Sequence, residues 1–253
     1  MKRLLFLFLA ALMMVVPVVS CKKDTKDKKD IERPKHVPEG AVDLGIVMTR
    51  EDGTTYYLYW ATCNICVDGF VSSPEVFGDY YAWGETAPKS EYNWSTYKFG
   101  TSDNGPFSKY VTKEAYGEVD NKTVLETGPE GDDVVSKLLG GKWRMPTDAE
   151  WTALREKCEW VWTDNYNNTL TAGRIVTSKI EGYQDKSIFL PAACHMFNST
   201  LQDTAHPHGS YWSSSLYEYN PQSAGYVGFY NEKVSRYDFF RCSGYSVRPV
   251  YED

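Results

Sequence analysis

Short apolar runs that alternate with polar residues recur along most of the chain and predict β-strands. The predicted strands span residues 41–48, 55–60, 173–180, 187–191, 211–215, 225–231, 234–240 and 245–251. Within one of these runs Val227 and Phe229 fall on one side and Tyr226 and Tyr230 on the other, as expected of a strand with one buried face. The polar residues 231–233 then predict a hairpin turn.

Two segments have helical periodicity instead. Acidic residues at 132–133 precede the apolar segment 134–139, and two glycines follow, which matches a helix with an acidic start and a left-handed stop. The second segment begins with Thr-Asp-Ala-Glu at 147–150, a capping box, and predicts a helix from Thr147 to about Lys157. Three residues then share one helix face at spacings of three and four: Trp151, Leu154 and Cys158.

Long polar loops separate these elements, at 67–88, 91–111, 164–171 and 197–209. A chain with few helices, short strands and long loops is α+β by pattern, and we expect one domain over residues 41–253. Function in such a domain is expected on the loops, which a fixed framework holds in place.

The first residues have a different pattern. Lys2 and Arg3 precede an uncharged, mostly apolar run at 4–19, and small residues lead to Cys21. This pattern predicts a secretory signal over residues 1–20, too short to be a comfortable membrane span. Val-Val-Ser-Cys resembles the lipobox of bacterial lipoproteins, which implies lipid attachment at Cys21 and a membrane as partner. The alternative is an ordinary cleaved signal with a chance cysteine.

Residues 21–40 contain many lysines and aspartates and little apolar surface, which predicts a charged, flexible tether. Its lysines could contact anionic headgroups, but Asp24, Asp27 and Asp30 offset them, so a plain spacer is the simpler interpretation. We expect the exported protein to lie at the outer membrane or cell surface.

Composition narrows the classes of function. The net charge of −7 gives no basic footprint, so we expect no nucleic-acid partner. The chain contains 8 Trp and 19 Tyr, which suits loop-rich β folds and also carbohydrate stacking. Composition alone therefore does not separate core aromatics from binding-site aromatics.

Six cysteines occur in the chain, and five remain if Cys21 carries lipid. An odd number leaves at least one thiol free or paired between chains. Cys63 and Cys66 have Cys-x-x-Cys spacing, but the motif follows a strand-like run with no helical period, and no second pair exists to complete a zinc site. Structural pairing of one of these cysteines is the favoured interpretation.

Several sequence blocks resemble a known family when they are taken in order. The blocks are Ala-Val-Asp-Leu-Gly at 41–45, Trp-Ala-Thr-Cys-Asn at 60–64, Gly-Asp-Tyr-Tyr-Ala-Trp-Gly-Glu-Thr at 78–86, Gly-Lys-Trp-Arg-Met-Pro-Thr-Asp-Ala-Glu-Trp at 141–151, Tyr-Trp-Ser-Ser-Ser at 211–215 and Ser-Val-Arg-Pro-Val at 246–250. Together they resemble the Fibrobacter succinogenes major paralogous domain family, which is found in Bacteroidetes-type surface lipoproteins. The resemblance implies the C-type-lectin-like fold of formylglycine-generating enzymes, with twisted antiparallel strands and irregular loops. It also implies a disulfide between Cys63 and Cys158.

These sequence blocks have the physical character of a framework. We expect Trp143, Trp151 and Trp212 to anchor the core. Arg144 and Arg248 stand beside apolar residues, where a guanidinium bonds backbone carbonyls or a carboxylate such as that of Glu150.

Enzyme chemistry finds little support in the residues. A formylglycine-type oxidoreductase requires a cysteine pair such as Cys194 and Cys242, but the cysteine motif of that family is absent. His206 and His208 could seat a metal ion, although solvated loop histidines are the simpler alternative. Oxygen ligands at 164–168 could hold calcium, although Asp and Asn also simply form turns. We expect no catalytic residues, no cofactor and no metal.

The leading hypothesis is therefore a non-enzymatic, surface-anchored binding or adhesion module for a glycan or a protein. Aromatic loop residues are its candidate ligand contacts: Tyr92, Trp94, Tyr97, Tyr217 and Tyr219. The alternatives are a cysteine oxidoreductase of the formylglycine-enzyme type and a purely structural surface protein.

Overall fold

A computed structural model describes residues 36–253. The predicted signal at 1–20, the lipid site at Cys21 and most of the tether at 21–40 lie outside the described residues. All of the described residues belong to one compact unit, which ends at Asp253.

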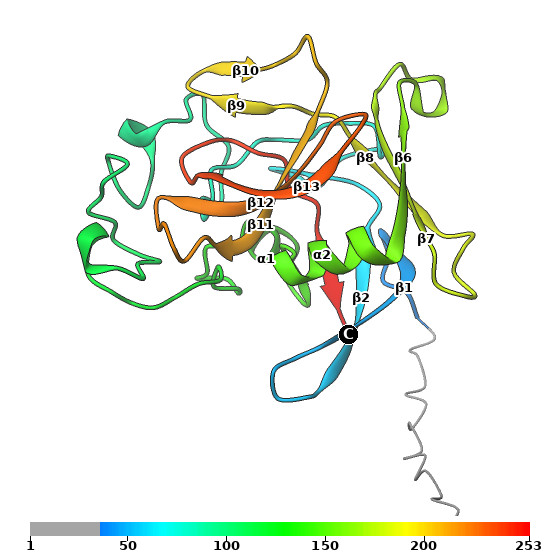
Figure 1. Cartoon of the computed structure of the whole chain (residues 1–253), viewed down its shortest axis with the longest axis horizontal. Helices are drawn as coiled ribbons and strands as arrows, with labels where there is room; N and C mark the ends of the chain where they lie inside the picture. The colour runs from blue at the N-terminus through cyan, green and yellow to red at the C-terminus, as the bar shows by residue number, and fades with distance from the viewer. Residues whose placement is uncertain (1–35) are drawn as a thin grey trace, which may run out of the picture. The chain divides into compact units, whose positions relative to one another are not determined.

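Five small sheets, all with antiparallel strands, make up most of the regular structure (Figure 1). The largest has the order β1 (Ala41–Thr49), β2 (Thr55–Ala61), β14 (Val250–Glu252), β5 (Trp143–Arg144). Two three-stranded sheets contain β6 (Cys158–Thr163), β7 (Gly173–Ser178) and β8 (Ser187–Pro191), and β11 (Gly209–Leu216), β12 (Ser223–Phe229) and β13 (Val234–Phe240). Two ribbons pair β3 (Ile65–Cys66) with β4 (Gly69–Phe70), and β9 (His195–Phe197) with β10 (Thr200–Gln202).

Both predicted α-helices form, and their caps are the ones that the sequence indicates. The carboxylate of Asp133 accepts hydrogen bonds from the first backbone amides of α1 (Val134–Leu139). In α2 (Asp148–Lys157), Thr147 and Glu150 complete the predicted capping box. Three 3₁₀ turns lie in the loops, η1 (Trp94–Thr96), η2 (Glu114–Tyr116) and η3 (Tyr166–Asn168).

Helix α2 holds the three larger sheets together. It contacts β1 of the first sheet, β6 of the second and all three strands of the third (Figure 1). Trp151 projects from its buried face, packs against Trp60 with ring centroids 4.7 Å apart and donates its indole N–H to the carbonyl of Trp212. A second apolar cluster surrounds Trp212 and Trp83, so the core has two aromatic centres.

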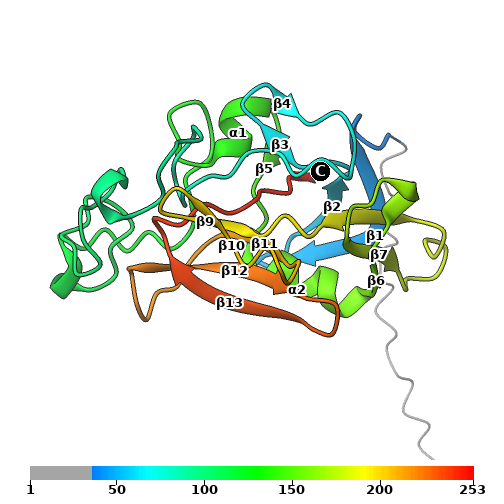
Figure 2. The same ribbon diagram turned by 90° about the horizontal axis from the view of Figure 1, so that it is seen from above.

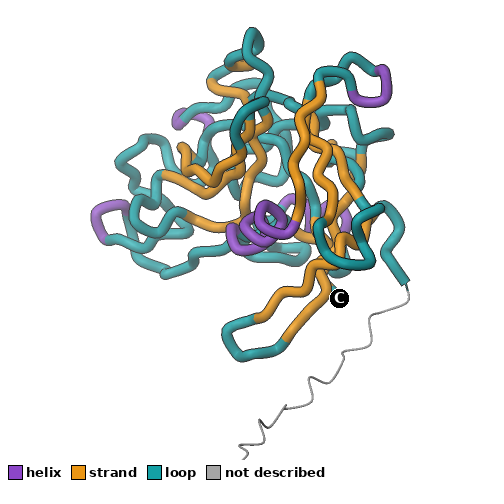
Figure 3. Tube along the Cα trace, turned by 45° about the vertical axis from the view of Figure 1, so that its right-hand side comes forward, coloured by secondary structure: helices purple, strands orange, loops and turns teal. Residues whose placement is uncertain are grey.

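Helix α1 lies beside the β3–β4 ribbon (Figure 2), where Leu139 reaches Gly69. Loops occupy much of the remaining chain (Figure 3), and they carry buried aromatic side chains as well as polar ones. The described part is thus rich in antiparallel strands with two α-helices, an α+β arrangement as predicted. No helix among residues 36–253 is long and apolar enough to span a bilayer.

Strand predictions were confirmed for seven of the eight runs with small changes in their ends. The prediction for 245–251 was wrong for most of its length, because only its last residues enter β14. Tyr245 and Ser246 are extended but form single bridges to Tyr81 and Tyr211, which belong to different parts of the fold. The strand β6, which follows α2 directly, was not predicted.

Candidate binding cavity

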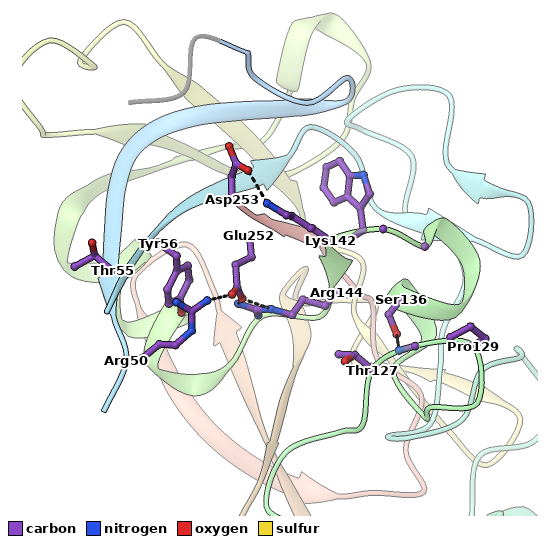
Figure 4. A pocket seen from close by; sticks show the side chains of 14 residues that line it. Arg50, Thr55, Tyr56, Thr127, Pro129, Ser136, Lys142, Arg144, Glu252 and Asp253 are labelled. Atoms are coloured by element: carbon purple, nitrogen blue, oxygen red, sulfur yellow. Dashed lines mark hydrogen bonds and ion pairs between the residues drawn. The ribbon is translucent and has the colours of Figure 1, made fainter. Parts of the chain in front are cut away.

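A cavity of about 610 Å³ opens between the β1–β2 hairpin and the C-terminal end of α1 (Figure 4). Its wall on the hairpin side carries Arg50 and Tyr56, and the wall opposite includes Ser136 and Pro129. Strands β5 and β14 contribute its floor and rim. The volume lies within the range of ordinary small-ligand pockets.

A double-glycine turn shapes one side of the cavity. Gly140 and Gly141 both have left-handed backbone, with φ of 65° and 60°. Glycine adopts this region without the strain that a side chain would add, so the chain can reverse sharply between α1 and β5. The turn brings Lys142, Trp143 and Arg144 to the cavity immediately after the helix ends.

A network of ion pairs crosses the floor. The guanidinium of Arg144 donates to Glu150 Oε2 at 2.8 Å and to Glu252 Oε2 at 2.7 Å. Glu252 also accepts a hydrogen bond from Arg50, so one carboxylate of β14 joins two arginines from distant segments (Figure 4). The Glu150 side chain is fully buried, which makes this pairing necessary for its charge.

Burial alone would raise the pKa of Glu150, but the hydrogen bonds and positive charge of Arg144 outweigh it and lower that pKa. The same pairing raises the pKa of Arg144 despite its desolvation. Glu150 also accepts a hydrogen bond from the Tyr56 hydroxyl at 2.8 Å. Burial, together with the nearby Glu150 charge, raises the pKa of Tyr56 to about 12. The tyrosine is therefore a fixed donor at neutral pH.

The rim of the cavity is more exposed. Lys142 donates to Asp253 Oδ1 at 2.7 Å, with side-chain exposures of 55% and 30%. The Asp253 hydrogen bond raises the pKa of Lys142. Exposed ion pairs contribute little stability, so both side chains are available to exchange their partner for a ligand.

Two aromatic rings border the polar groups. The Arg50 guanidinium lies 4.4 Å from the ring centre of Tyr56, a cation–π arrangement that holds both side chains. Trp143 is half-buried and meets Phe70 and Tyr251 edge-on, with ring centroids 5.1 and 5.3 Å away. The cavity thus combines apolar faces with fixed donors and acceptors, an arrangement that can hydrogen-bond and stack on a polyhydroxylated ligand.

The aromatic loop residues predicted to bind ligand do not line this cavity. Tyr92 and Tyr97, which were predicted to contact ligand, are core residues and only 2% and 4% exposed. Their hydroxyls donate to the carbonyls of Tyr80 and Trp83 at 2.6 and 2.8 Å. A tyrosine in a polar loop can be buried in this way because its hydroxyl satisfies an internal carbonyl.

Trp94 is half-buried and stacks on Phe107, with ring centroids 5.6 Å apart. Tyr219 is 70% exposed and contacts Tyr217 in the loop between β11 and β12. The Arg236 guanidinium lies over the ring of Tyr217, 5.3 Å from its centre. Of the five predicted ligand contacts, Tyr219 has the most accessible side chain.

The predicted disulfide between Cys63 and Cys158 is absent from the structure, in which the five described cysteines are free thiols. Cys158 begins β6 within the cluster around Trp151, whereas Cys63 follows β2 beside Thr62. Burial raises the pKa of the Cys158 thiol to about 12. The two cysteines thus have different neighbours and are not bonded to each other.

Cys194 and Cys242 are buried as well, with 5% and 0% exposure. Burial raises the pKa of both thiols, to about 12 for Cys242. Since the thiolate is the reactive form, these surroundings oppose redox chemistry at neutral pH.

The two histidines of the His-Pro-His segment do not act together. His206 is exposed, whereas His208 is buried and faces His195. Among residues 36–253, no group of three or more His, Cys, Asp or Glu side chains is placed to hold a metal ion. In the loop considered for calcium, Asp164 instead accepts the Trp162 indole N–H at 2.7 Å.

Sequence reasoning missed most of the cavity. The cavity brings Glu252 to Arg50 and Tyr56 only because β2 pairs with β14. The two strands lie nearly 200 residues apart in the sequence. Trp143 and Arg144 were predicted as framework, and they also face the cavity. The cluster Gly-Gly-Lys-Trp-Arg at 140–144 was the one local signal of an exposed, chemically mixed turn.

A scan against models of protein families found no match, and searches of curated proteins and of solved structures found none either. Function is therefore inferred from the chain's own residues and from this cavity.

Proposed function

We propose that the chain is an exported, lipid-anchored surface protein that acts as a non-enzymatic binding module, and that its ligand is a neutral saccharide. The observation that carries the proposal is the cavity beside β5, where two aromatic rings border a network of paired charges. Sugar rings offer both an apolar face and many hydroxyls, and this wall offers a partner for each.

Paired charges favour a neutral ligand over an ionic one. Arg50, Lys142 and Arg144 each have a carboxylate partner, so the cavity presents both signs of charge side by side. A hydroxyl group can donate to a carboxylate and accept from a guanidinium in the same place. Because the carboxylates lining the wall are engaged with cations, they serve as acceptors better than as general acids or bases.

The proposed location follows from the sequence of the first residues, with Cys21 as the lipid site and the charged tether as a spacer. The proposed C-type-lectin-like fold and the family resemblance rest on the order of the sequence blocks. Arg248 of one block donates to the carbonyls of Ala61 and Thr62 in another, at 3.0 and 2.6 Å. Blocks that are joined in this way act as a common framework.

The structure gives less support to the two alternatives, a cysteine oxidoreductase and a purely structural protein. An oxidoreductase would use accessible, low-pKa thiols, whereas Cys194 and Cys242 are buried and their pKa values are raised. A purely structural protein needs no concave binding site, whereas this chain has a cavity of about 610 Å³.

The test is binding of the full-length chain, solubilised in detergent, to an array of neutral and anionic oligosaccharides. We expect binding to neutral glycans. The strongest glycan is then titrated against Arg50→Ala and Lys142→Ala, which remove exposed lining residues without disturbing the core. Loss of a hydrogen bond to a charged group should weaken binding by about tenfold or more.

Lys186→Ala is the matched control, since Lys186 is similarly exposed and lies away from the cavity. Tyr219→Ala tests the loop that the sequence analysis favoured. If Tyr219→Ala abolishes binding while Arg50→Ala does not, the ligand binds at the loop and the proposed site is wrong. Binding to no glycan on the array would contradict the saccharide class itself.

A further inference from the structure

A second, smaller cavity of about 170 Å³ lies against the β11–β12–β13 sheet, and two histidines from different segments face each other in its wall. His195 comes from β9 and His208 from the residue just before β11. The other lining groups include Ser210 and the tyrosines Tyr226, Tyr230 and Tyr237. This cavity is separate from the proposed saccharide site, and its chemistry is independent of it.

The contacts of His208 fix where its proton resides. Its Nδ1 lies 3.2 Å from the carbonyl oxygen of His206, a group that can only accept, so Nδ1 carries the proton. Its Nε2 then carries the lone pair, which accepts a hydrogen bond from Nδ1 of His195 at 3.0 Å. A histidine whose second nitrogen donates to a backbone carbonyl has the orientation that metal-binding histidines commonly show.

The spacing between the two nitrogens also suits a metal ion. Two imidazole nitrogens bound at about 2.0–2.1 Å in tetrahedral geometry would be about 3.4 Å apart. The observed separation of 3.0 Å would widen to about 3.4 Å when the rings rotate to point both nitrogens at a shared ion. His195 would release its Nδ1 proton and accept one at Nε2, so both rings stay neutral and the proton count does not change.

The surroundings hold the rings and leave room beside them. His208 stacks on Tyr230 at 5.3 Å, and His195 meets Tyr245 edge-on at 5.2 Å, which restrains both orientations. Water takes about 30 Å³ per molecule, so the cavity has space for an ion with several waters. No third His, Cys, Asp or Glu among the described residues completes the set, so solvent would fill the other positions.

We propose that His195 and His208 form a two-imidazole site for a divalent transition-metal ion of the class that prefers nitrogen ligands, such as Cu²⁺, Ni²⁺ or Zn²⁺. Affinity in this class is greatest for Cu²⁺, which makes it the most sensitive probe. The open coordination positions face the tyrosine and serine hydroxyls of the cavity.

The chain contains only four histidines, which allows a clean experiment. The full-length protein is titrated with Cu²⁺ and followed by electron paramagnetic resonance, including spin-echo detection of imidazole nitrogens. We expect one equivalent of bound Cu²⁺ with two imidazole ligands. His195→Gln and His208→Gln should each lose this signal, while His36→Gln and His206→Gln should keep it.

Circular dichroism and a thermal melt establish that each variant is folded. His195 is only partly buried, so His195→Gln carries the test if His208→Gln does not fold. The spectrum of the wild-type protein decides independently of any variant. Absence of a two-imidazole signal at one equivalent, or its retention in folded His195→Gln, would overturn the proposal.

Discussion

Two arginines, Arg248 and the partly buried Arg144, show how single residues hold distant segments of this protein together. Arg248 is fully buried, and no carboxylate among residues 36–253 pairs with it. Its guanidinium donates to three backbone carbonyls, those of Ala61, Thr62 and Phe189, and to Oδ1 of Asn64. Arg144 instead forms ion pairs with carboxylates, as the sequence analysis anticipated. The planar, branched guanidinium makes both arrangements possible, because its donors point in several directions at once.

Replacing Arg248 by lysine should therefore be strongly destabilising even though the charge is kept. A lysine ammonium cannot reach all four acceptors, and each buried acceptor left without a donor costs about 1–3 kcal/mol. We expect the free energy of unfolding of Arg248→Lys to fall by about 3 kcal/mol or more, measured by urea denaturation. Arg155→Lys, at a partly exposed position on α2, is the control and should change little. An Arg248→Lys variant as stable as the wild type would show that the carbonyls find other partners.

Glu150 should make stability depend on pH in the acid range. Its pKa in the folded protein is lower than its usual value of 4.5, so the folded state binds fewer protons than the unfolded state. The stabilisation is complete above the unfolded pKa and is lost as pH falls through the folded one. Breaking this buried pair with Glu150→Gln should cost about 3 kcal/mol at neutral pH.

Urea unfolding of wild type and Glu150→Gln at pH 7 and at successively lower pH values measures this effect. The difference between the two proteins should shrink as the medium becomes acidic, because protonation removes the charge that the variant already lacks. Other carboxylates, such as Asp132, titrate in both proteins and cancel in the comparison. A difference that stays constant between neutral and acid pH would contradict a lowered pKa for Glu150.

At the scale of single elements, local signals were reliable where the cause is itself local. The capping box of Thr147 and Glu150 fixes the start of α2, and the hairpin turn at 231–233 joins β12 to β13 with Tyr230 N–H bonded to the Lys233 carbonyl at 2.9 Å. Both depend on residues within a few positions of each other. Such features are decided by side-chain chemistry that the sequence states directly.

Elements that depend on distant partners were not predictable in this way. Strand β6 begins at Cys158, where the helical spacing of α2 also places an apolar residue, so its period of two is hidden at its start. The segment before β14 is extended, yet its bridges reach several separate partners instead of one neighbouring strand. Tyr92 and Tyr97 lie in a polar loop whose burial depends on carbonyls of Tyr80 and Trp83.

The cap of α2 supports a prediction at this scale. Thr147→Ala removes the hydroxyl that accepts the Glu150 backbone amide, and loss of such a cap costs about 1 kcal/mol. Thr152→Ala in the same helix is the matched control. The Thr152 hydroxyl donates to the Asp148 carbonyl, and alanine favours helix more strongly than threonine. Thr152→Ala should therefore leave the free energy of unfolding unchanged or raise it slightly. Equal losses in the two variants, by urea denaturation, would argue against a capping role for Thr147.

At the scale of the whole molecule, the order β1-β2-β14-β5 brings the two ends of the folded unit together. Arg50 from the first hairpin and Glu252 from the last strand meet through this pairing, and Arg144 joins them from the middle of the chain. The proposed saccharide site is thus a product of the complete fold. No single segment contains enough of it to be recognised in the sequence.

The cysteines give a last prediction about the assembled molecule. The structure holds Cys63, Cys158, Cys194 and Cys242 as buried free thiols, whereas Cys66 is partly exposed. A thiol reacts as its thiolate and must be reached by reagent, so burial and raised pKa values slow reaction at Cys158, Cys194 and Cys242.

Brief alkylation of the native, non-reduced protein should therefore label Cys66 before the other four, as mapped by mass spectrometry of its peptides. After unfolding in denaturant without reductant, all five should be labelled to the same extent. Peptides joined by a disulfide under these conditions would contradict the free-thiol arrangement, while uniform labelling of the native protein would show that the core opens more readily than its packing implies.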